Sequence, residues 1–265
     1  MLGKLDQARS AVEKALYGWG ILRAHRLPLP DFLGIGVQKA GTTWLYRNLT
    51  QHPELFLPEP KELHYFDWNF RNSLRSYSRH FAPGVGRVKG EITPNYCTLP
   101  VARIAFVRQI LPHVRLILLL RNPVERAWSQ AVMNLVEKTG RAFDQVADDE
   151  FLRHFEHQRS VARGDYLANL DRWRQFFPEQ HFFCGFFESI TERPQVMLAE
   201  IFRFLGVSTA VDWDRFPVTA IFYPGVGVPL PDRFRQVLLD RYRSDIEQLY
   251  ARFGAPVAGW RVPAS

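Results

Sequence analysis

The chain has 265 residues, of which 46% are hydrophobic and 23% charged, a composition typical of an ordinary soluble globular protein. Its 34 lysines and arginines outnumber its 27 acidic residues, and the formal net charge of +7 favours anionic partners such as nucleotides or phosphorylated ligands. The basic residues are scattered and never form a run of five, so we expect no nucleic-acid-binding stripe.

The number of cysteines and the length of the apolar runs indicate in which cellular compartment the protein is expected. The two cysteines, Cys97 and Cys184, are too few for a disulfide framework or a four-ligand zinc site. Residues 1–27 lack a continuous apolar stretch, so no secretory signal is expected. The longest apolar run, 116–120, is too short to span a bilayer. We therefore expect a cytoplasmic protein with no membrane span.

The chain begins with an amphipathic pattern. Apolar residues recur at helical spacing over 2–19, with Lys, Asp, Gln and Glu between them. This segment is expected to be a helix that either packs on the domain or docks a partner, and Pro28 and Pro30 then mark a short linker. We expect residues 1–30 to form an N-terminal helical arm and linker, and residues 31–265 to form one domain.

A short apolar strand is expected over 31–37, a loop over 38–43 and a helix over 44–51. This order of strand, glycine-containing loop and helix is that of a P-loop-like phosphate-binding unit. The two glycines and the final threonine of a nucleotide triphosphatase loop are in place, but Thr42 stands where that motif requires lysine. The lysine of this loop is Lys39, three residues earlier. The loop therefore predicts a phosphate-bearing nucleotide and argues against ordinary ATP hydrolysis.

Strands and helices alternate through the rest of the chain. The run at 115–120 is apolar without interruption, as expected for a parallel strand covered on both faces. Asn122 and Pro123 suit the N-cap and the first position of the helix that follows. Further strands are expected over 62–66, 90–96 (a strand end entering a turn) and 181–187, and further helices over 71–81, 101–111, 166–177, 194–205 and 230–253. The fold class is therefore α/β, with a central, mainly parallel sheet flanked by helices.

Four segments, in this order, resemble those of one enzyme family. They are QKAGTTWL at 38–45, KELHYFD at 61–67, GEITPNY at 90–96 and LILLLRNPVERAWS at 116–129. Together they resemble the sulfotransferases that use 3′-phosphoadenosine-5′-phosphosulfate (PAPS), most closely the branch of heparan sulfate sulfotransferases and bacterial enzymes. The resemblance extends over about 31–206. It implies in-line transfer of a sulfonate group from PAPS to a hydroxyl or amine of an acceptor, with release of PAP and without a metal.

The resemblance assigns roles within these segments. Lys39 would stabilise the charge that grows on the leaving bridge oxygen, and it would also touch the 5′-phosphate. Arg121 and Ser129 would hold the 3′-phosphate, while Arg126 either assists them or forms a surface salt bridge. The residues expected to bind the nucleotide are Lys39, Ala40, Gly41, Thr42, Thr43, Trp44, Arg121 and Ser129.

Sulfonate transfer also needs a base that takes the proton of the acceptor. Glu62 and His64 alternate along the strand expected over 62–66, so they should share one face. Glu62 matches the catalytic carboxylate of the resembled family, and His64 either orients it or is itself the base. Asp67 is expected to line the cleft. In the plainer alternative, Glu62 pairs with Lys61 or a nearby arginine, and His64 is only a packed polar residue.

The chain departs from the resembled family at three places. Ile92 stands where a lysine usually follows the glutamate, the stretch 223–229 lacks basic residues, and the usual cystine is missing. Two other functions are kept as alternatives: a P-loop kinase or nucleotide triphosphatase, and a PAP-binding module without catalysis. The acceptor is open among a small molecule, a lipid and a glycan, and the sequence does not set the oligomeric state.

Overall fold

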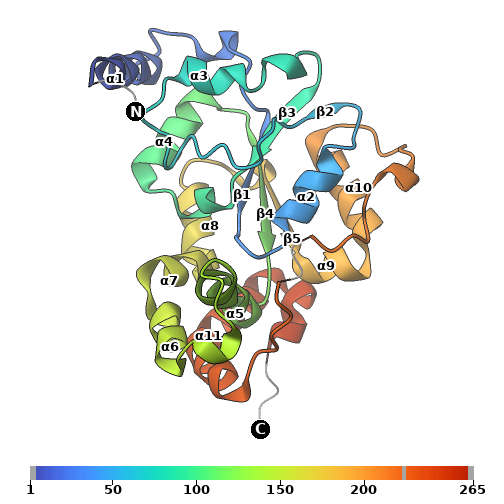
Figure 1. Ribbon diagram of the computed structural model, residues 1–265. Helices are drawn as coiled ribbons and strands as arrows, with labels where there is room; N and C mark the ends of the chain where they lie inside the picture. Colours follow the sequence, from blue (N-terminus) through green and yellow to red (C-terminus); the bar gives the residue numbers. More distant parts are fainter. Residues whose placement is uncertain (1–3, 223–224, 262–265) are drawn as a thin grey trace.

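A five-stranded sheet forms the centre of the protein (Figure 1). The computed structural model describes residues 4–222 and 225–261. The strands are β1 (Phe32–Gly36), β2 (Leu55–Phe56), β3 (Val88–Ile92), β4 (Arg115–Leu120) and β5 (Phe182–Phe186). Their order is β2-β3-β1-β4-β5, and every neighbouring pair is parallel. This arrangement confirms the α/β class and the parallel sheet expected from the sequence.

The sheet is covered by α-helices on both of its faces. The α-helices of the described residues are α1 (Lys4–Gly18), α2 (Thr42–Leu49), α3 (Leu74–Arg79), α4 (Val101–Ile110), α5 (Pro123–Val132), α6 (Asp148–Glu156), α7 (Gln158–Gly164), α8 (Tyr166–Arg174), α9 (Phe187–Glu192), α10 (Pro194–Leu205) and α11 (Asp232–Phe253). Figure 1 shows α2 and α10 on one side of the sheet, and α4 and α8 on the other. Because β4 has apolar side chains on both faces, both faces must be covered, and its residues from Leu116 to Leu120 are buried.

The strand order reverses beside β1. The chain passes from β1 to β2 and β3 on one side, and later to β4 and β5 on the other. Leu33 of β1 is therefore paired with Glu91 of β3 on one side and with Leu116 of β4 on the other. In open parallel sheets, ligands bind outside the carboxyl ends of the strands at such a reversal. The fold alone thus points to the loops that follow β1, β3 and β4.

The amino-terminal helix α1 packs on the domain, which is one of its two expected roles. The Glu13 carboxylate accepts a hydrogen bond of 3.1 Å from the Leu74 N–H, and the Lys14 ammonium lies 4.6 Å from the centre of the Phe70 ring. The apolar stripe is less complete than expected, because Trp19 lies beyond the helix and is 75% exposed. Leu2, the first residue of the expected helix, lies outside the described residues.

Three sequence-based expectations are wrong. The segment 62–66 is a loop and not a strand, because Glu62 and His64 have φ values of +67° and +53°, which a strand does not allow. The helix expected over 71–81 is only α3, which begins after Ser73, whose hydroxyl accepts a hydrogen bond from the Ser76 N–H. The short helices α6, α7 and α9 were not expected.

The third wrong expectation concerns Arg126, which does not lie on the surface. Its side chain is fully buried beneath α7. It donates hydrogen bonds of 2.6 Å to the Gln130 side chain and 3.2 Å to the Ser160 carbonyl. The first bond lies within α5 and the second joins α5 to α7, so Arg126 serves the packing of the helices rather than a surface salt bridge. None of the helices formed by the described residues combines the length and the apolar character needed to cross a membrane.

Candidate active site

A cleft of about 1260 Å³ opens where the loops after β1, β3 and β4 meet. All of the predicted nucleotide-binding and catalytic residues except Ala40 line this cleft, whereas Asp67, which was expected to line it, does not. Ala40 is fully buried beneath it, so only its backbone could serve a ligand. The loops that follow three neighbouring strands thus bring together residues that are up to 90 positions apart in the sequence, from Lys39 to Ser129. Their individual roles stay predictions.

The loop after β1 has the geometry of an anion cradle. Lys39 and Gly41 have φ values of +69° and +87°, so the chain turns back on itself before α2 begins at Thr42. Gly41 has no side chain that could cap α2, and Thr42, Thr43 and Trp44 line the cleft. The first N–H groups of a helix carry partial positive charge and bind anions. The loop can therefore hold a phosphate with its backbone.

Lys39 and Arg121 supply positive charge beside this loop. The Arg121 guanidinium donates a hydrogen bond of 3.3 Å to the Lys39 carbonyl, and it lies 4.5 Å from the centre of the Phe187 ring. Burial lowers the pKa of Lys39, the nearby Glu137 carboxylate opposes this change, and Arg121 adds to it. The hydroxyl of Tyr166 donates a hydrogen bond of 2.8 Å to the Arg121 carbonyl, which fixes the backbone at the end of β4.

The helix α5 presents Ser129 to the cleft. Asn122 caps this helix, since its side chain accepts a hydrogen bond of 3.0 Å from the Val124 N–H, as its sequence suggested. Ser129 lies about two turns further along α5, on the face that lines the cleft. Arg121, just before the helix, and Ser129, within it, thus border the same space, as the resemblance implied.

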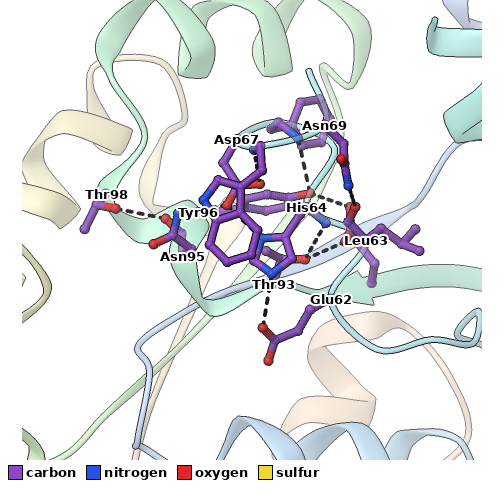
Figure 2. A network of polar contacts seen from close by, with 12 residues as sticks. Glu62, Leu63, His64, Asp67, Asn69, Thr93, Asn95, Tyr96 and Thr98 are labelled. Atoms are coloured by element: carbon purple, nitrogen blue, oxygen red, sulfur yellow. Dashed lines mark hydrogen bonds and ion pairs between the residues drawn. The ribbon is translucent and has the colours of Figure 1, made fainter. Parts of the chain in front are cut away.

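Between β2 and α3, three polar side chains form a chain of contacts (Figure 2). The His64 Nδ1 atom lies 2.8 Å from Asp67 Oδ2, and its Nε2 atom lies 3.4 Å from Glu62 Oε2. Glu62 also accepts a hydrogen bond of 2.5 Å from the Lys61 ammonium, and the His64 ring stacks on Trp68 at 3.7 Å. The alternation argument was wrong about the backbone, yet Glu62 and His64 do lie together.

The charges of this group follow from its contacts. Burial alone would raise the pKa of Glu62, but the hydrogen bonds from His64 and Lys61 lower it to about 2. Burial alone would lower the pKa of His64, but its bonds to Asp67 and Glu62 raise it to about 9. At neutral pH the group therefore holds an imidazolium between two carboxylates. In this state Glu62 can accept a proton, whereas His64 can only donate hydrogen bonds.

The family of the chain follows from comparison with known proteins. Residues 29–216 match the family described as Sulfotransferase domain. The chain belongs to the sulfotransferase family. It is 30% identical over 190 residues to heparan sulfate glucosamine 3-O-sulfotransferase 6 of Homo sapiens, which covers 70% of this chain and 55% of that protein. It is 39% identical over 109 residues to the membrane-associated sulfotransferase kil1 of Dictyostelium discoideum, which covers 39% of this chain and 23% of that protein.

A solved sulfotransferase shares the fold over nearly its whole length. The sulfotransferase from Alicyclobacillus acidocaldarius superposes with a TM-score of 0.69 and 25% sequence identity, and the match covers 88% of this chain and 99% of that one. The curated relatives are longer, since this chain spans 23% of the first and 55% of the second. Membership in the sulfotransferase family therefore rests on the shared domain.

Several contacts of the candidate site were not expected from the sequence. The Asn95 side-chain amide donates a hydrogen bond of 2.8 Å to Asp67, and its Oδ1 atom accepts one of 3.0 Å from Arg163. Asn95 lies in the segment GEITPNY, and the resemblance of this segment to the family was the sequence feature that could have indicated its role. The Trp44 indole donates a hydrogen bond of 2.8 Å to the Val218 carbonyl. Nothing local in the sequence indicated this long-range contact.

The segment that precedes α11 borders the cleft. The Trp128 indole donates a hydrogen bond of 3.0 Å to the Val228 carbonyl, and Gly225 to Leu230 line the cleft. Tyr223 and Pro224 lie outside the described residues. Among the described residues, no three His, Cys, Asp or Glu side chains gather in a way that could hold a metal ion.

Proposed function

We propose that this protein transfers a sulfonate group from PAPS to a hydroxyl or amine of an acceptor and releases PAP. One observation supports the proposal above all: the phosphate loop (38–43) and the side chains of Glu62 and His64 line the same cleft, and Asp67 holds His64 from behind. An anion cradle without a base would suit a nucleotide-binding module. A base beside the cradle is what group transfer requires.

The donor would lie across the loop after β1 and the start of α5. The N–H groups of Thr42 and Thr43 would bind the 5′-phosphate, and Lys39 would contact the bridge oxygen between phosphorus and sulfur. Arg121 and Ser129 would bind the 3′-phosphate, because a guanidinium matches phosphate with two parallel hydrogen bonds. The cradle lacks the lysine that serves β- and γ-phosphates, which argues against the nucleotide triphosphatase alternative.

The reaction would proceed in one displacement at sulfur. The acceptor oxygen or nitrogen forms a bond to sulfur, while the bond from sulfur to the bridge oxygen breaks and its electron pair stays on PAP. Glu62 takes the acceptor proton, because its carboxylate is ionised at neutral pH. Lys39 stabilises the negative charge that develops on the leaving oxygen. His64 holds Glu62 in place from the other side.

We propose an acceptor with an apolar part, such as a small molecule or a lipid, rather than a highly anionic glycan. The charged side chains that line the cleft are Lys39, Arg47, Lys61, the imidazolium of His64, Arg121, Glu59, Glu62, Glu125 and Glu137. Two of these cations are assigned to the donor, and Lys61 pairs with Glu62. Ile221 and Val226, which are 80% and 51% exposed, add apolar surface to the same cleft.

Calorimetric titration with PAP tests the donor site. We expect PAP to bind, AMP to bind far more weakly because it lacks the 3′-phosphate, and ATP with Mg²⁺ to bind more weakly than PAP. Stronger binding of ATP with Mg²⁺ would replace the proposal by the nucleotide triphosphatase alternative. Release of PAP from PAPS in the presence of hydroxylated acceptors then separates an enzyme from a PAP-binding module. The cytoplasmic location expected from the sequence stays a prediction.

A further inference from the structure

Glu91 is a buried carboxylate that no step of the proposed reaction uses. It lies on β3 beside the central strand, and it is 2% exposed. The Tyr77 hydroxyl donates a hydrogen bond of 2.5 Å to it, the Tyr96 hydroxyl one of 3.0 Å, and the Thr93 hydroxyl one of 2.8 Å. The backbone N–H of Leu63 is a fourth donor. A carboxylate has about four acceptor positions, so Glu91 is saturated by donors.

Two of these hydroxyls also hold the loop that carries the proposed base. The Thr93 hydroxyl accepts a hydrogen bond of 3.4 Å from the His64 N–H, and the Tyr96 hydroxyl accepts one of 3.3 Å from the Phe66 N–H. In Figure 2, Thr93 and Tyr96 lie against this loop. Together with the direct bond from Leu63, the cluster around Glu91 therefore fixes three backbone N–H groups within four consecutive residues.

The loop needs such support because its backbone is strained. Glu62 and His64 both adopt the left-handed conformation, with φ values of +67° and +53°. Non-glycine residues persist in this conformation only when their surroundings determine it. The strained pair brackets Leu63, the residue whose N–H donates to Glu91. The anchor therefore lies between the two side chains that it would orient.

We propose that Glu91 is a positioning residue, whose carboxylate holds the loop over 62–66 so that Glu62 and His64 face the reacting atoms. The proposal rests on the function proposed above, because it presumes that Glu62 and His64 act in sulfonate transfer. Glu91 itself is too deeply buried to reach a substrate. It acts through Leu63 directly and through Thr93 and Tyr96 indirectly.

The variant Glu91→Gln tests this role with little change in volume. Glutamine offers one acceptor oxygen to four donors and adds two N–H groups of its own, so the loop loses part of its anchor. We expect the turnover number for sulfonate transfer to fall by about 10²-fold, as for a misplacement of about 1 Å. PAP affinity should stay unchanged, because the phosphate loop does not contact Glu91. The pKa of His64, followed by NMR, should fall from about 9 toward its ordinary 6.5 as His64 and Glu62 separate.

A purely structural role makes a different prediction. In that case Glu91→Gln lowers the melting temperature, but the folded variant keeps both its turnover number and the His64 titration. This result would overturn the proposal. If the wild-type protein binds PAP yet transfers no sulfonate, the proposed function fails, while the His64 titration in Glu91→Gln still decides whether Glu91 positions the loop.

If Glu91→Gln does not fold, a matched pair of variants tests the same positioning role. Tyr77→Phe and Thr93→Val each remove one hydroxyl that donates to Glu91, but only the Thr93 hydroxyl also holds a loop N–H. We expect Thr93→Val to lower the turnover number and the His64 pKa, and Tyr77→Phe to leave both unchanged. Equal effects of the two variants on both quantities would contradict a positioning role.

Discussion

The imidazole of His64 lies 2.8 Å from the Asp67 carboxylate, on the side of the ring opposite Glu62. Asp67 is itself held by a hydrogen bond of 2.8 Å from Asn95. The proposed base is therefore the end of a chain of polar contacts that reaches back to the loop after β3. Each link of this chain has a consequence that can be measured.

The pH dependence of turnover should reflect these charges. Glu62 is ionised above a pKa of about 2, so we expect no loss of activity between pH 8 and pH 5 from protonation of the base. Activity should fall as the pH rises through about 9, where His64 loses the proton that it shares with Glu62. Asp67→Asn should move this alkaline limb to lower pH, because it removes one carboxylate that stabilises the imidazolium. An unchanged limb in Asp67→Asn would show that another group titrates there.

The shifted pKa values of His64 and Glu62 also affect folding stability, His64 at alkaline pH and Glu62 at acidic pH. The pKa of His64 is raised, so its contribution is complete below its ordinary value of 6.5 and is lost as the pH rises through about 9. The pKa of Glu62 is lowered, so its contribution is complete above its ordinary value of 4.5 and is lost as the pH falls through about 2. Urea unfolding of wild type and His64→Ala at pH 6 and pH 10 measures the first effect. The difference in stability between the two proteins should be larger at pH 6.

Replacing the proposed base should separate catalysis from binding. Glu62→Gln keeps the side-chain volume but cannot take a proton, so we expect turnover to fall by about 10²–10⁴-fold. Calorimetry should find PAP affinity unchanged, because Glu62 is not one of the residues proposed to bind the nucleotide. Lys61→Met is the control, since it removes the hydrogen-bond partner of Glu62 and leaves the carboxylate in place. Turnover of Glu62→Gln at the wild-type rate would exclude Glu62 as the base.

Regular elements could be predicted because they depend on local sequence. The apolar run of β4 and the helix α10, with Pro194 at its start and Gly206 after its end, have the same bounds in the structure as in the prediction. The segment 62–66 could not be predicted in this way. Its alternation of polar and apolar residues imitates a strand, while its actual shape depends on Glu91 and Thr93, which lie about thirty residues later in the chain. The burial of Arg126 likewise depends on α7, a helix that was not expected from the sequence.

The candidate site likewise combines residues that could be predicted from the sequence with contacts that depend on the packed fold. Lys39, Arg121 and Ser129 could be proposed because they lie in motifs that resemble those of the sulfotransferase family. The contact between Asn95 and Arg163 joins two segments whose separation carries no sequence signal. Residues that line the cleft after the strands are thus predictable from the chain, whereas the bonds that hold them in position come from the packed fold.

Arg121 should distinguish ligands by their 3′-phosphate. Arg121→Ala removes a charged hydrogen bond worth about 1.5–3 kcal/mol, so PAP should bind about 10- to 150-fold more weakly. Adenosine-5′-phosphosulfate lacks the 3′-phosphate, and its affinity should change little. Calorimetry with both ligands measures the ratio. Equal losses for the two ligands would mean that Arg121 supports the fold of the cleft, through its contacts with Lys39 and Phe187, and not the 3′-phosphate.

Lys39 should matter more for turnover than for binding. Lys39→Ala removes the cation proposed to stabilise the leaving oxygen, and loss of one such donor costs about 10²–10³-fold in turnover number. PAP affinity should fall less, because the N–H groups at the start of α2 still hold the 5′-phosphate. Lys138→Ala, which removes a nearby exposed lysine, is the control for general charge effects and should retain wild-type turnover. A loss in affinity as large as the loss in turnover would assign Lys39 to ground-state binding alone.

Two glycines with the same backbone conformation separate the phosphate loop from general stability. Gly41 and Gly86 have φ values of +87° and +85°, so alanine at either position is strained by about 1–2 kcal/mol. A Cβ atom at Gly41 would lie 2.3 Å from the Cδ1 atom of Ile190, at the wall of the cleft, whereas a Cβ at Gly86 meets nothing within 4 Å. Gly41→Ala should therefore lose both PAP affinity and stability, and Gly86→Ala should lose stability alone. Calorimetry and thermal unfolding of both variants measure the two effects, and equal PAP affinity in both would show that the conformation at Gly41 does not shape the phosphate site.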